Sequence, residues 1–309
     1  MAVLGIDTSN YTTSFALLCE DGSVIQKKRL LPVKEGERGL RQSDAVFHHT
    51  KAYYDLLSQL IDECPEKITA AGASVSPTTQ KGSYMPCFLV GENLGRSLAA
   101  VLGVPFFSFS HQQGHIAAAL YSAGKTELFN KQFIAFHVSG GTTDAVLCEP
   151  QGETGLFITP LTSSNDLKAG QAVDRIGVKM GCAFPCGKEV EALALKSDKT
   201  YKNKIRLYDG CCSLSGLENK CLKMLANGAS REDTSAFLLS YIADTLCEMT
   251  TFLFSQYGEL PIIFAGGVMS NSLIRAKIQS RFNADFAAPE FSCDNAAGIA
   301  LLTSREVNL

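Results

Sequence analysis

The first thirty residues show short apolar runs separated by small polar segments. AVLGID is followed by TSNYTT and then by a second apolar run, SFALLCE. Apolar runs of this length around a short polar segment predict two strands joined as a hairpin, with Ser and Thr at its tip. A DGS turn comes next, and VIQKKRLLPV predicts a third strand after it.

Longer segments carry the spacing of apolar positions that an amphipathic helix requires. We expect SDAVFHHTKAYYDLLSQLIDECP to form a helix that Ser43 caps and Pro65 ends. FLVGENLGRSLAAVLG and AGQAVDRIGVKMG predict helices that stop at Gly103 and Gly181. The longest such segment is TSAFLLSYIADTLCEMTTFLFSQYG. Short apolar segments, ITAAGASVSP and VPFFSFS, predict buried strands among these helices.

The opening pattern occurs a second time in the middle of the chain. QFIAFHVSGGTTDAVLCE is again a strand, a small polar turn and a strand, and each copy has an acidic residue near the turn, Asp7 and Asp144. A duplicated unit of this kind predicts two similar domains. We place them at residues 1–130 and 131–295, and we expect a last helix over 296–309 to pack back on the first domain.

The composition is that of an ordinary globular protein, with 309 residues, 46% hydrophobic and 19% charged. No apolar run approaches the roughly 20 residues of a membrane span, and the N-terminus lacks a basic start and a cleavage site. We therefore expect a cytoplasmic protein with no membrane partner. Eleven cysteines without a C-x-x-C pair predict reduced thiols.

The formal net charge of −3 argues against a general nucleic-acid binder, which would be basic overall. It leaves room for a local basic patch, and the candidates are KKR (27–29), Arg38, Arg41 and KSDKTYKNKIR (196–206). The interpretation that we favour for these charges is a solvated surface.

Two of the five histidines stand four residues apart in SHQQGHIAAA. On a helix, His111 and His115 would share one face and could chelate a divalent metal, or they could be ordinary histidines beside a core. The zinc-protease motif H-E-x-x-H requires a glutamate after the first histidine, and here that residue is Gln112. An amide cannot act as the general base, so the sequence opposes a peptidase of that type.

Three turns have the small residues that let backbone N–H groups approach a phosphate: DTSNYTT, SGGTTD and AGGVMSNS. Two hairpin tips of the same kind and a strand–Gly-Gly–helix turn are the layout of the actin/Hsp70/sugar-kinase class. The predicted fold is therefore α/β, with two ribonuclease-H-like domains and a nucleotide in the cleft between them.

Seven motifs follow one another along the chain: VLGIDTS, SHQQGHIAAA, VSGGTTDAV, AGQAVDRIGVKMG, SLSGLENK, AGGVMSNSLIR and SCDNAAGIA. In the same order they resemble V-L-G-I-E-T-S, the H-M-E-G-H helix, V-S-G-G-H-T, A-G-E-A-F-D-K, F-S-G-L-K-T, A-G-G-V-x-x-N-x-x-L-R and C-T-D-N-A-A of the TsaD family, once called glycoproteases. The resemblance covers nearly the whole chain.

The resemblance implies that one divalent metal, iron, zinc or magnesium, is held by His111, His115 and Asp294. It also implies an adenine nucleotide, as ATP, AMP or an acyl-adenylate. Asp174 would bind the ribose hydroxyls. The residues that match the family's nucleotide site are Ser139, Gly140, Gly141, Thr142, Asp174, Gly187 and Asn271.

TsaD enzymes transfer a threonylcarbamoyl group from an adenylate to N6 of the adenosine beside the anticodon of certain tRNAs. The resemblance therefore implies a transferase that takes tRNA as a partner, together with a TsaB-like paralogous subunit or a second copy of the chain. Catalytic residues are expected at the opening motif: Asp7, Ser9 and Thr12.

Several positions depart from the family pattern. Tyr11 and Thr12 replace an acidic pair, Asp7 replaces a glutamate, Thr142 a histidine and Gln171 a glutamate. These changes are typical of a paralogue and leave two alternatives open. One is a carbamoyl-type transferase that uses an adenylate donor on another acceptor. The other is a non-catalytic partner subunit, although TsaB-like subunits lack the histidine pair.

Overall fold

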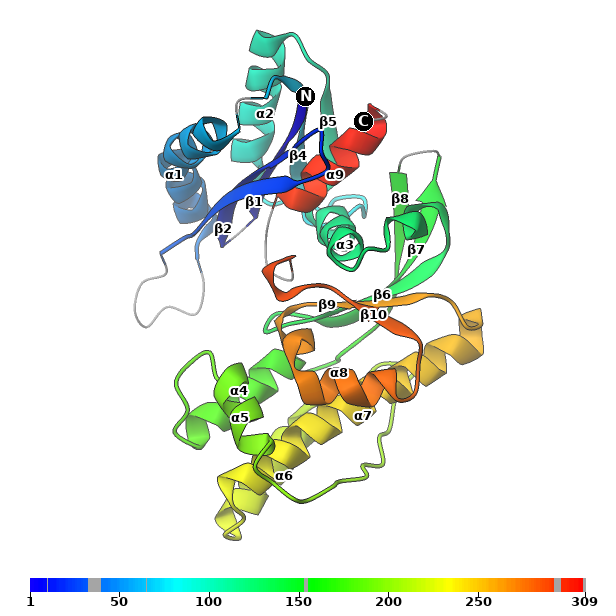
Figure 1. Cartoon of the computed structure of the whole chain (residues 1–309). Coiled ribbons are helices and arrows are strands. Elements are labelled where there is room, and N and C mark those ends of the chain that lie inside the picture. Colours follow the sequence, from blue (N-terminus) through cyan, green and yellow to red (C-terminus); the bar gives the residue numbers. More distant parts are fainter. Residues whose placement is uncertain (10, 33–39, 65, 153–154, 292–295, 308–309) are drawn as a thin grey trace. The chain divides into compact units, whose positions relative to one another are not determined.

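The computed structural model describes the chain except for residues 10, 33–39, 65, 153–154, 292–295 and 308–309 (Figure 1). The chain divides into two compact units. Unit 1 comprises Met1–Asn130, Glu149–Ile158 and Glu290–Leu309, and unit 2 comprises Lys131–Cys148 and Thr159–Pro289. The metal ligand expected at Asp294 lies outside the described residues.

The sheet of unit 1 begins with the predicted three-stranded meander. Its strands are β1 (Ala2–Ser9), β2 (Thr12–Leu18), β3 (Val24–Leu30), β4 (Ile68–Ser76) and β5 (Phe106–Ser110), in the order β3-β2-β1-β4-β5. The first three strands are antiparallel, with Ser9 opposite Thr12 at the hairpin tip, and β4 and β5 continue in parallel.

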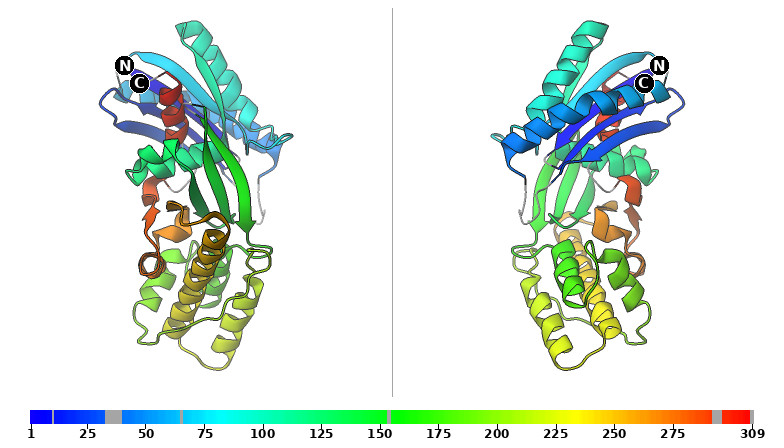
Figure 2. Two further views of the ribbon diagram at one scale, coloured as in Figure 1. Left: turned by 90° about the vertical axis from the view of Figure 1, so that its right-hand side faces the viewer. Right: turned by 90° about the vertical axis from the view of Figure 1, so that its left-hand side faces the viewer.

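Helices cover both faces of this sheet (Figures 1 and 2). They are α1 (Gln42–Glu63), α2 (Phe88–Leu102), α3 (His111–Ser122) and α9 (Ala297–Glu306), with a 3₁₀ turn η1 at Thr126–Asn130. Because side chains alternate along a strand, Leu4 and Ile6 of β1 face the core formed with α1 and α2. Gly5 faces the other way, and a Cβ there would lie 2.4 Å from the Ala300 nitrogen of α9.

The predicted helix ends are partly correct. Gly103 and Gly181 have φ of +67° and +81° and follow α2 and α4 as expected. Ser43 does not cap α1, because that helix begins one residue earlier and its N-cap, Arg41, makes no side-chain cap bond. Pro65, the predicted end of α1, lies outside the described residues.

The second sheet repeats the topology of the first. Its strands are β6 (Phe133–Val138), β7 (Thr143–Gln151), β8 (Gly155–Ser163), β9 (Ile262–Ala265) and β10 (Ala284–Phe286). Read from β8, the order β8-β7-β6-β9-β10 is the order of the first sheet, and β6 again pairs antiparallel with β7 and parallel with β9. The duplication seen in the sequence is therefore a duplication of the sheet.

The core of unit 2 is formed by helices on one face of its sheet (Figure 1). They are α4 (Ala169–Lys179), α5 (Gly187–Ala194), α6 (Ser215–Ala226), α7 (Arg231–Tyr257) and α8 (Ser272–Gln279), with 3₁₀ turns η2 at Gly267–Ser270 and η3 at Pro289–Phe291. Within the described part of the chain, α7 alone is long and apolar enough to cross a membrane. However, 56% of its most apolar window is buried inside the protein, as in a core helix.

Candidate functional site

The histidine pair lies at the start of α3 in unit 1. Strand β5 leads directly into this helix, which Ser110 caps by accepting from the Gln113 N–H at 3.2 Å, while Gln113 Oε1 accepts from the Ser110 N–H at 2.8 Å. This capping box fixes His111 as the first helical residue. His115 follows one turn later, and the two Nε2 atoms are 2.9 Å apart.

Asp7 orients the first histidine from β1. Its Oδ1 lies 3.1 Å from His111 Nδ1 and also accepts a hydrogen bond from Ser74 Oγ of the neighbouring strand β4. A carboxylate at Nδ1 keeps the proton on that nitrogen, so the Nε2 lone pair points toward His115. Two imidazole nitrogens 2.9 Å apart, with one ring held by a buried carboxylate, are a pair that one metal ion could bind.

The helix that carries the pair is held against α9 by two glycines. A Cβ added at Gly298 would lie 1.8 Å from the backbone oxygen of Gly114, the residue just before His115. Only glycine permits this approach of the two backbones. The position of the histidines therefore depends on α9.

The three residues expected to be catalytic lie on the β1–β2 hairpin. Asp7 is fully buried behind His111, whereas Ser9 and Thr12 are buried opposite each other at the hairpin tip. Among the described residues, Ser9 Oγ and Asp7 Oδ2 are buried without a hydrogen-bond partner.

Sequence reasoning missed His49. This residue of α1 is fully buried, its Nδ1 lies 2.8 Å from Thr13 Oγ1, and its Nε2 has no hydrogen-bond partner in the described part of the chain. Burial lowers the pKa of His49 to about 4, although the nearby Asp7 charge opposes the shift. The signal was present, because His49 falls in the helical series of buried positions Ala45, His49, Ala52, Leu56 and Leu60.

Unit 2 contains a cavity of about 830 Å³, within the usual range for small-molecule sites. Four of the seven residues expected to bind the nucleotide line it: Gly140, Asp174, Gly187 and Asn271. The sequence gives no local reason for these residues, which come from four separate segments, to meet. The fold of unit 2 brings them together.

The polar groups of this cavity are held in place by the backbone. Asp174 Oδ1 accepts from the Cys186 N–H at 2.8 Å, which places the residue before Gly187 against α4. Asn271 caps α8, since its Oδ1 accepts from the Ile274 N–H at 3.0 Å. A ligand contact by Asn271 would therefore use the amide nitrogen.

The turn between β6 and β7 presents Gly140 to the cavity, and the other three residues of the turn shape it. Ser139 Oγ accepts from the N–H groups of Gly141 and Thr142 at 3.2 Å each. Thr142 Oγ1 lies 2.9 Å from Nδ1 of His137. A Cβ at Gly140 would meet nothing within 4 Å, and neither would one at Gly187. The bare backbone at these two positions therefore leaves room for a ligand to approach closely, which fits a nucleotide.

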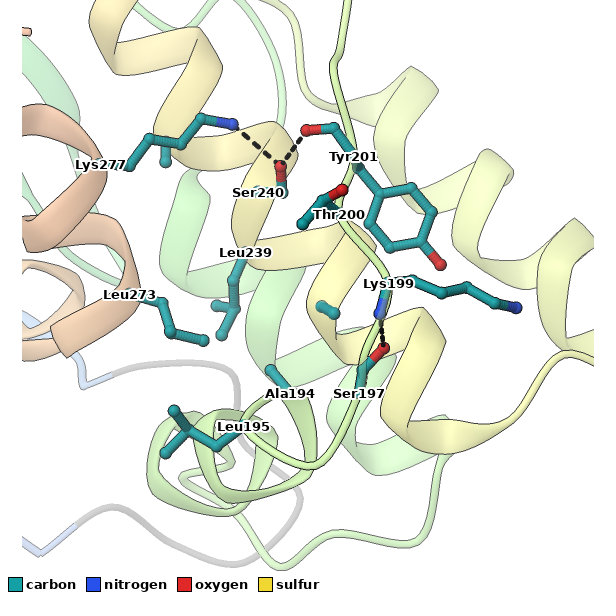
Figure 3. A pocket seen from close by; sticks show the side chains of 12 residues that line it. Ala194, Leu195, Ser197, Lys199, Thr200, Tyr201, Leu239, Ser240, Leu273 and Lys277 are labelled. Carbon is teal, nitrogen blue, oxygen red and sulfur yellow. Dashed lines mark hydrogen bonds between the residues drawn. The ribbon is translucent and has the colours of Figure 1, made fainter. Parts of the chain in front are cut away.

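A second cavity of unit 2, of about 400 Å³, lies beside the basic segment 196–206 (Figure 3). Ser240 of α7 donates to the Tyr201 backbone oxygen at 3.1 Å and accepts from Lys277 at 3.0 Å, which ties the segment to the helix. Lys199 is paired with Asp233 at 2.6 Å. Beyond Tyr201 the basic side chains are exposed at alternate positions, Lys202, Lys204 and Arg206.

Comparison with known proteins identifies relatives over nearly the full length. The family model for TsaD, tRNA N6-adenosine threonylcarbamoyltransferase, matches residues 35–301. The chain is 30% identical to the enzyme of that name from Kosmotoga olearia, over 98% of this chain and 92% of the relative. It is 28% identical to the one from Thermus thermophilus, over 99% and 93%.

Solved structures show the same fold at low sequence identity. Nucleotide-bound HypF superposes with a TM-score of 0.60 at 12% identity, over 99% of this chain and 46% of that chain. Component A of (R)-2-hydroxyglutaryl-CoA dehydratase from Acidaminococcus fermentans gives 0.55 at 15% identity over both complete chains. These likenesses confirm the predicted two-domain α/β fold class. The family match and the curated relatives show that this chain belongs to the TsaD family and is a transferase, not a peptidase.

Proposed function

We propose that this protein is a metal- and nucleotide-dependent transferase that moves a threonylcarbamoyl group from an adenylate to N6 of an adenosine in tRNA. One observation carries the proposal. Gly140, Asp174, Gly187 and Asn271, which the family resemblance implies as nucleotide-site residues in separate parts of the sequence, line one cavity large enough for a nucleotide.

Three of these four residues have a direct part in holding the adenylate. Asp174 accepts hydrogen bonds from the ribose hydroxyls, and Gly187 lies against the nucleoside, where a side chain would obstruct it. Gly140 brings the β6–β7 turn to the phosphate, since backbone N–H groups of such turns stabilise negative charge. In the reaction, the N6 amine forms a bond to the carbamoyl carbon and loses a proton to solvent, and the bond from that carbon to the phosphate oxygen breaks. The leaving AMP retains the negative charge that the turn stabilises.

The histidine pair holds the metal together with Asp294. Imidazole ligands favour iron or zinc over magnesium, which prefers oxygen ligands. A divalent metal held there would act as a Lewis acid and supply positive charge. Asp7 acts behind this pair, because its hydrogen bond to Nδ1 of His111 sets the orientation of that ring.

The partner surface of unit 1 is the exposed side of α1 and α2. Phe47 and Tyr54 of α1 are 62% and 73% exposed, and Leu89 of α2 is 43% exposed. Leu89 lines a groove of about 490 Å³ between the two helices, and Phe47 and Tyr54 are next in sequence to its lining residues Val46 and Tyr53. An exposed apolar patch of this kind marks a protein contact. We assign it to a TsaB-like paralogous subunit. Light scattering of the mixture should show a complex that F47S/Y54S abolishes, and a dimer of this chain alone through the same residues would refute the assignment.

The function is tested by a reconstituted reaction. The purified chain, metal, a threonylcarbamoyl-adenylate source, partner subunit and unmodified tRNA are combined, and the tRNA nucleosides are analysed by mass spectrometry. We expect threonylcarbamoyladenosine with wild type and none with H111A/H115A. Unmodified tRNA in the wild-type reaction, with a known TsaD enzyme active under the same conditions, would contradict the proposal.

A further inference from the structure

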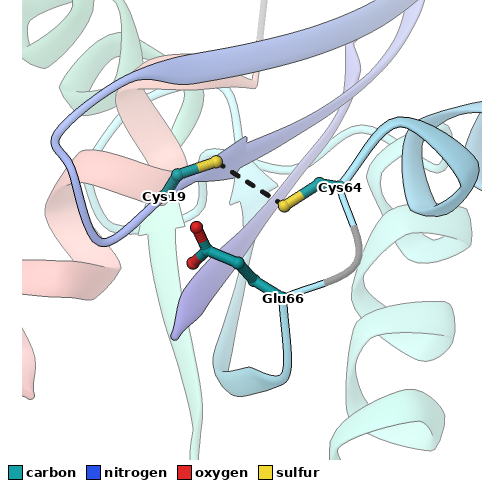
Figure 4. A group of neighbouring side chains, drawn as sticks. All are labelled: Cys19, Cys64 and Glu66. Carbon is teal, nitrogen blue, oxygen red and sulfur yellow. Dashed lines mark hydrogen bonds between the residues drawn. The ribbon is translucent and has the colours of Figure 1, made fainter.

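Two thiols and a carboxylate gather at one end of the first sheet of unit 1. Cys19 follows β2, Cys64 is the C-cap of α1, and Glu66 lies just before β4. The two sulfur atoms are 3.6 Å apart, and the potential ligand atoms of the three residues all lie within 4.8 Å of one another. Figure 4 shows both sulfurs and the carboxylate directed toward a common space.

The separation of the sulfurs suits a metal better than a disulfide. Two zinc–sulfur bonds of about 2.3 Å at a tetrahedral angle place their sulfurs about 3.8 Å apart. A disulfide requires about 2.05 Å, so the two sulfur atoms would have to approach each other by roughly 1.5 Å. The observed 3.6 Å therefore needs almost no adjustment to accept a tetrahedral cation.

We propose that Cys19, Cys64 and Glu66 bind one thiophilic divalent cation of the zinc type, with a water molecule as the fourth ligand. Binding releases the two thiol protons, so that two thiolates and a carboxylate bring three negative charges to the divalent cation. The Met1 ammonium, 2.9 Å from Glu66 Oε2, balances the remaining negative charge. Both thiols are buried, which favours thiolates paired with a cation over separate thiolates. Glu66 Oε2 is oriented by the Glu20 N–H at 3.2 Å and by the Met1 amine at 2.9 Å.

This site is separate from the histidine pair. Cys19 follows Leu18, which pairs with Val3 of β1, whereas His111 contacts Asp7, four residues further along that strand. Four residues of strand span about 13 Å, so one ion cannot serve both places. A cation here would join the end of α1, the β2–β3 turn and the start of β4. Its role would be to stabilise unit 1 without taking part in transfer.

The test is a cobalt(II) titration of the reduced, metal-free protein in an H111A/H115A background. We expect one equivalent of Co²⁺ to produce a thiolate-to-cobalt charge-transfer absorption, which zinc then displaces. The absorption should be lost in C19S and in C64S. It should persist in C221S, which removes a buried thiol of unit 2 instead. E66Q should keep both thiolates and weaken cobalt binding about tenfold.

Two results would overturn the proposal. One is the absence of thiolate charge transfer in the parent protein while circular dichroism shows it to be folded. The other is an absorption that remains unchanged in C19S or C64S. Because the histidine pair is already removed, neither result depends on the proposed transferase function.

Discussion

At the scale of single residues, the buried carboxylate of Asp7 influences two histidines of unit 1. Asp7 contacts Ser74 and His111, and its charge also acts on His49. No local pattern in the sequence links Asp7 to a histidine 104 residues away. One departure from the family pattern is offset by a neighbouring residue. Position 142 has threonine in place of the family histidine, but the imidazole of His137 lies next to the Thr142 hydroxyl.

His49 makes stability depend on pH. Its pKa of about 4 in the folded chain lies below the ordinary value of 6.5, so the unfolded chain binds more protons between these values. The free energy of unfolding should therefore fall by up to about 3 kcal/mol as the pH drops from 6.5 to 4. Urea unfolding of wild type and H49Q across this range should show a flatter profile for the variant. H48Q, on the neighbouring half-buried position, should follow wild type, and equal slopes for all three would refute the assignment.

At the scale of helices and strands, small residues decide how closely the elements approach. In β1, Gly5 lets α9 lie on the sheet, and Gly298 lets α9 reach α3. Gly170 does the same in unit 2, where a Cβ would lie 2.6 Å from the Gly140 nitrogen. These contacts set the positions of the histidine pair and of the β6–β7 turn.

G298A should destabilise the protein by about 3 kcal/mol, because the added methyl group meets the backbone of α3. It should also weaken metal binding at His111 and His115, since α3 has to move. The matched control is G216A in α6, where a Cβ meets nothing within 4 Å. Thermal unfolding and metal titration of both variants check this, and a G298A protein as stable as G216A would contradict it.

The sequence predicted the elements in which apolar positions repeat regularly or in which a glycine marks the end of a helix. The two hairpins and the helices ending before Gly103 and Gly181 belong to this group. The start of α1 was wrong at Ser43 because Arg41 occupies the N-cap without a side-chain bond. Strand β8 went unpredicted, since it is an edge strand that includes Pro160 and several half-exposed positions.

At the scale of the whole molecule, the sequence alone predicted the duplicated unit and the family. It did not predict which residues distant in the sequence lie close together in space. The cavity of unit 2 joins residues from position 140 to position 289, and only the fold brings them to one place.

The overall charge of −3 requires that tRNA binding come from a local patch. Lys202, Lys204 and Arg206 are exposed at alternate positions of an extended segment. Replacing all three by glutamine should weaken tRNA binding. The slope of log affinity against log salt concentration should become less negative by about two to three. K179Q/K223Q, which removes exposed lysines of α4 and α6, should leave the slope close to wild type. An unchanged slope in the triple variant would exclude this segment.

The central claim is that the cavity of unit 2 holds an adenylate through Asp174. The most direct measurement is a calorimetric titration of AMP and ATP into metal-loaded wild type and D174A. We predict one site per chain in wild type and an affinity at least about tenfold weaker in D174A, because the ribose hydroxyls lose their acceptor. Absence of nucleotide binding to the folded wild-type protein, or equal affinities for the two proteins, would contradict the account.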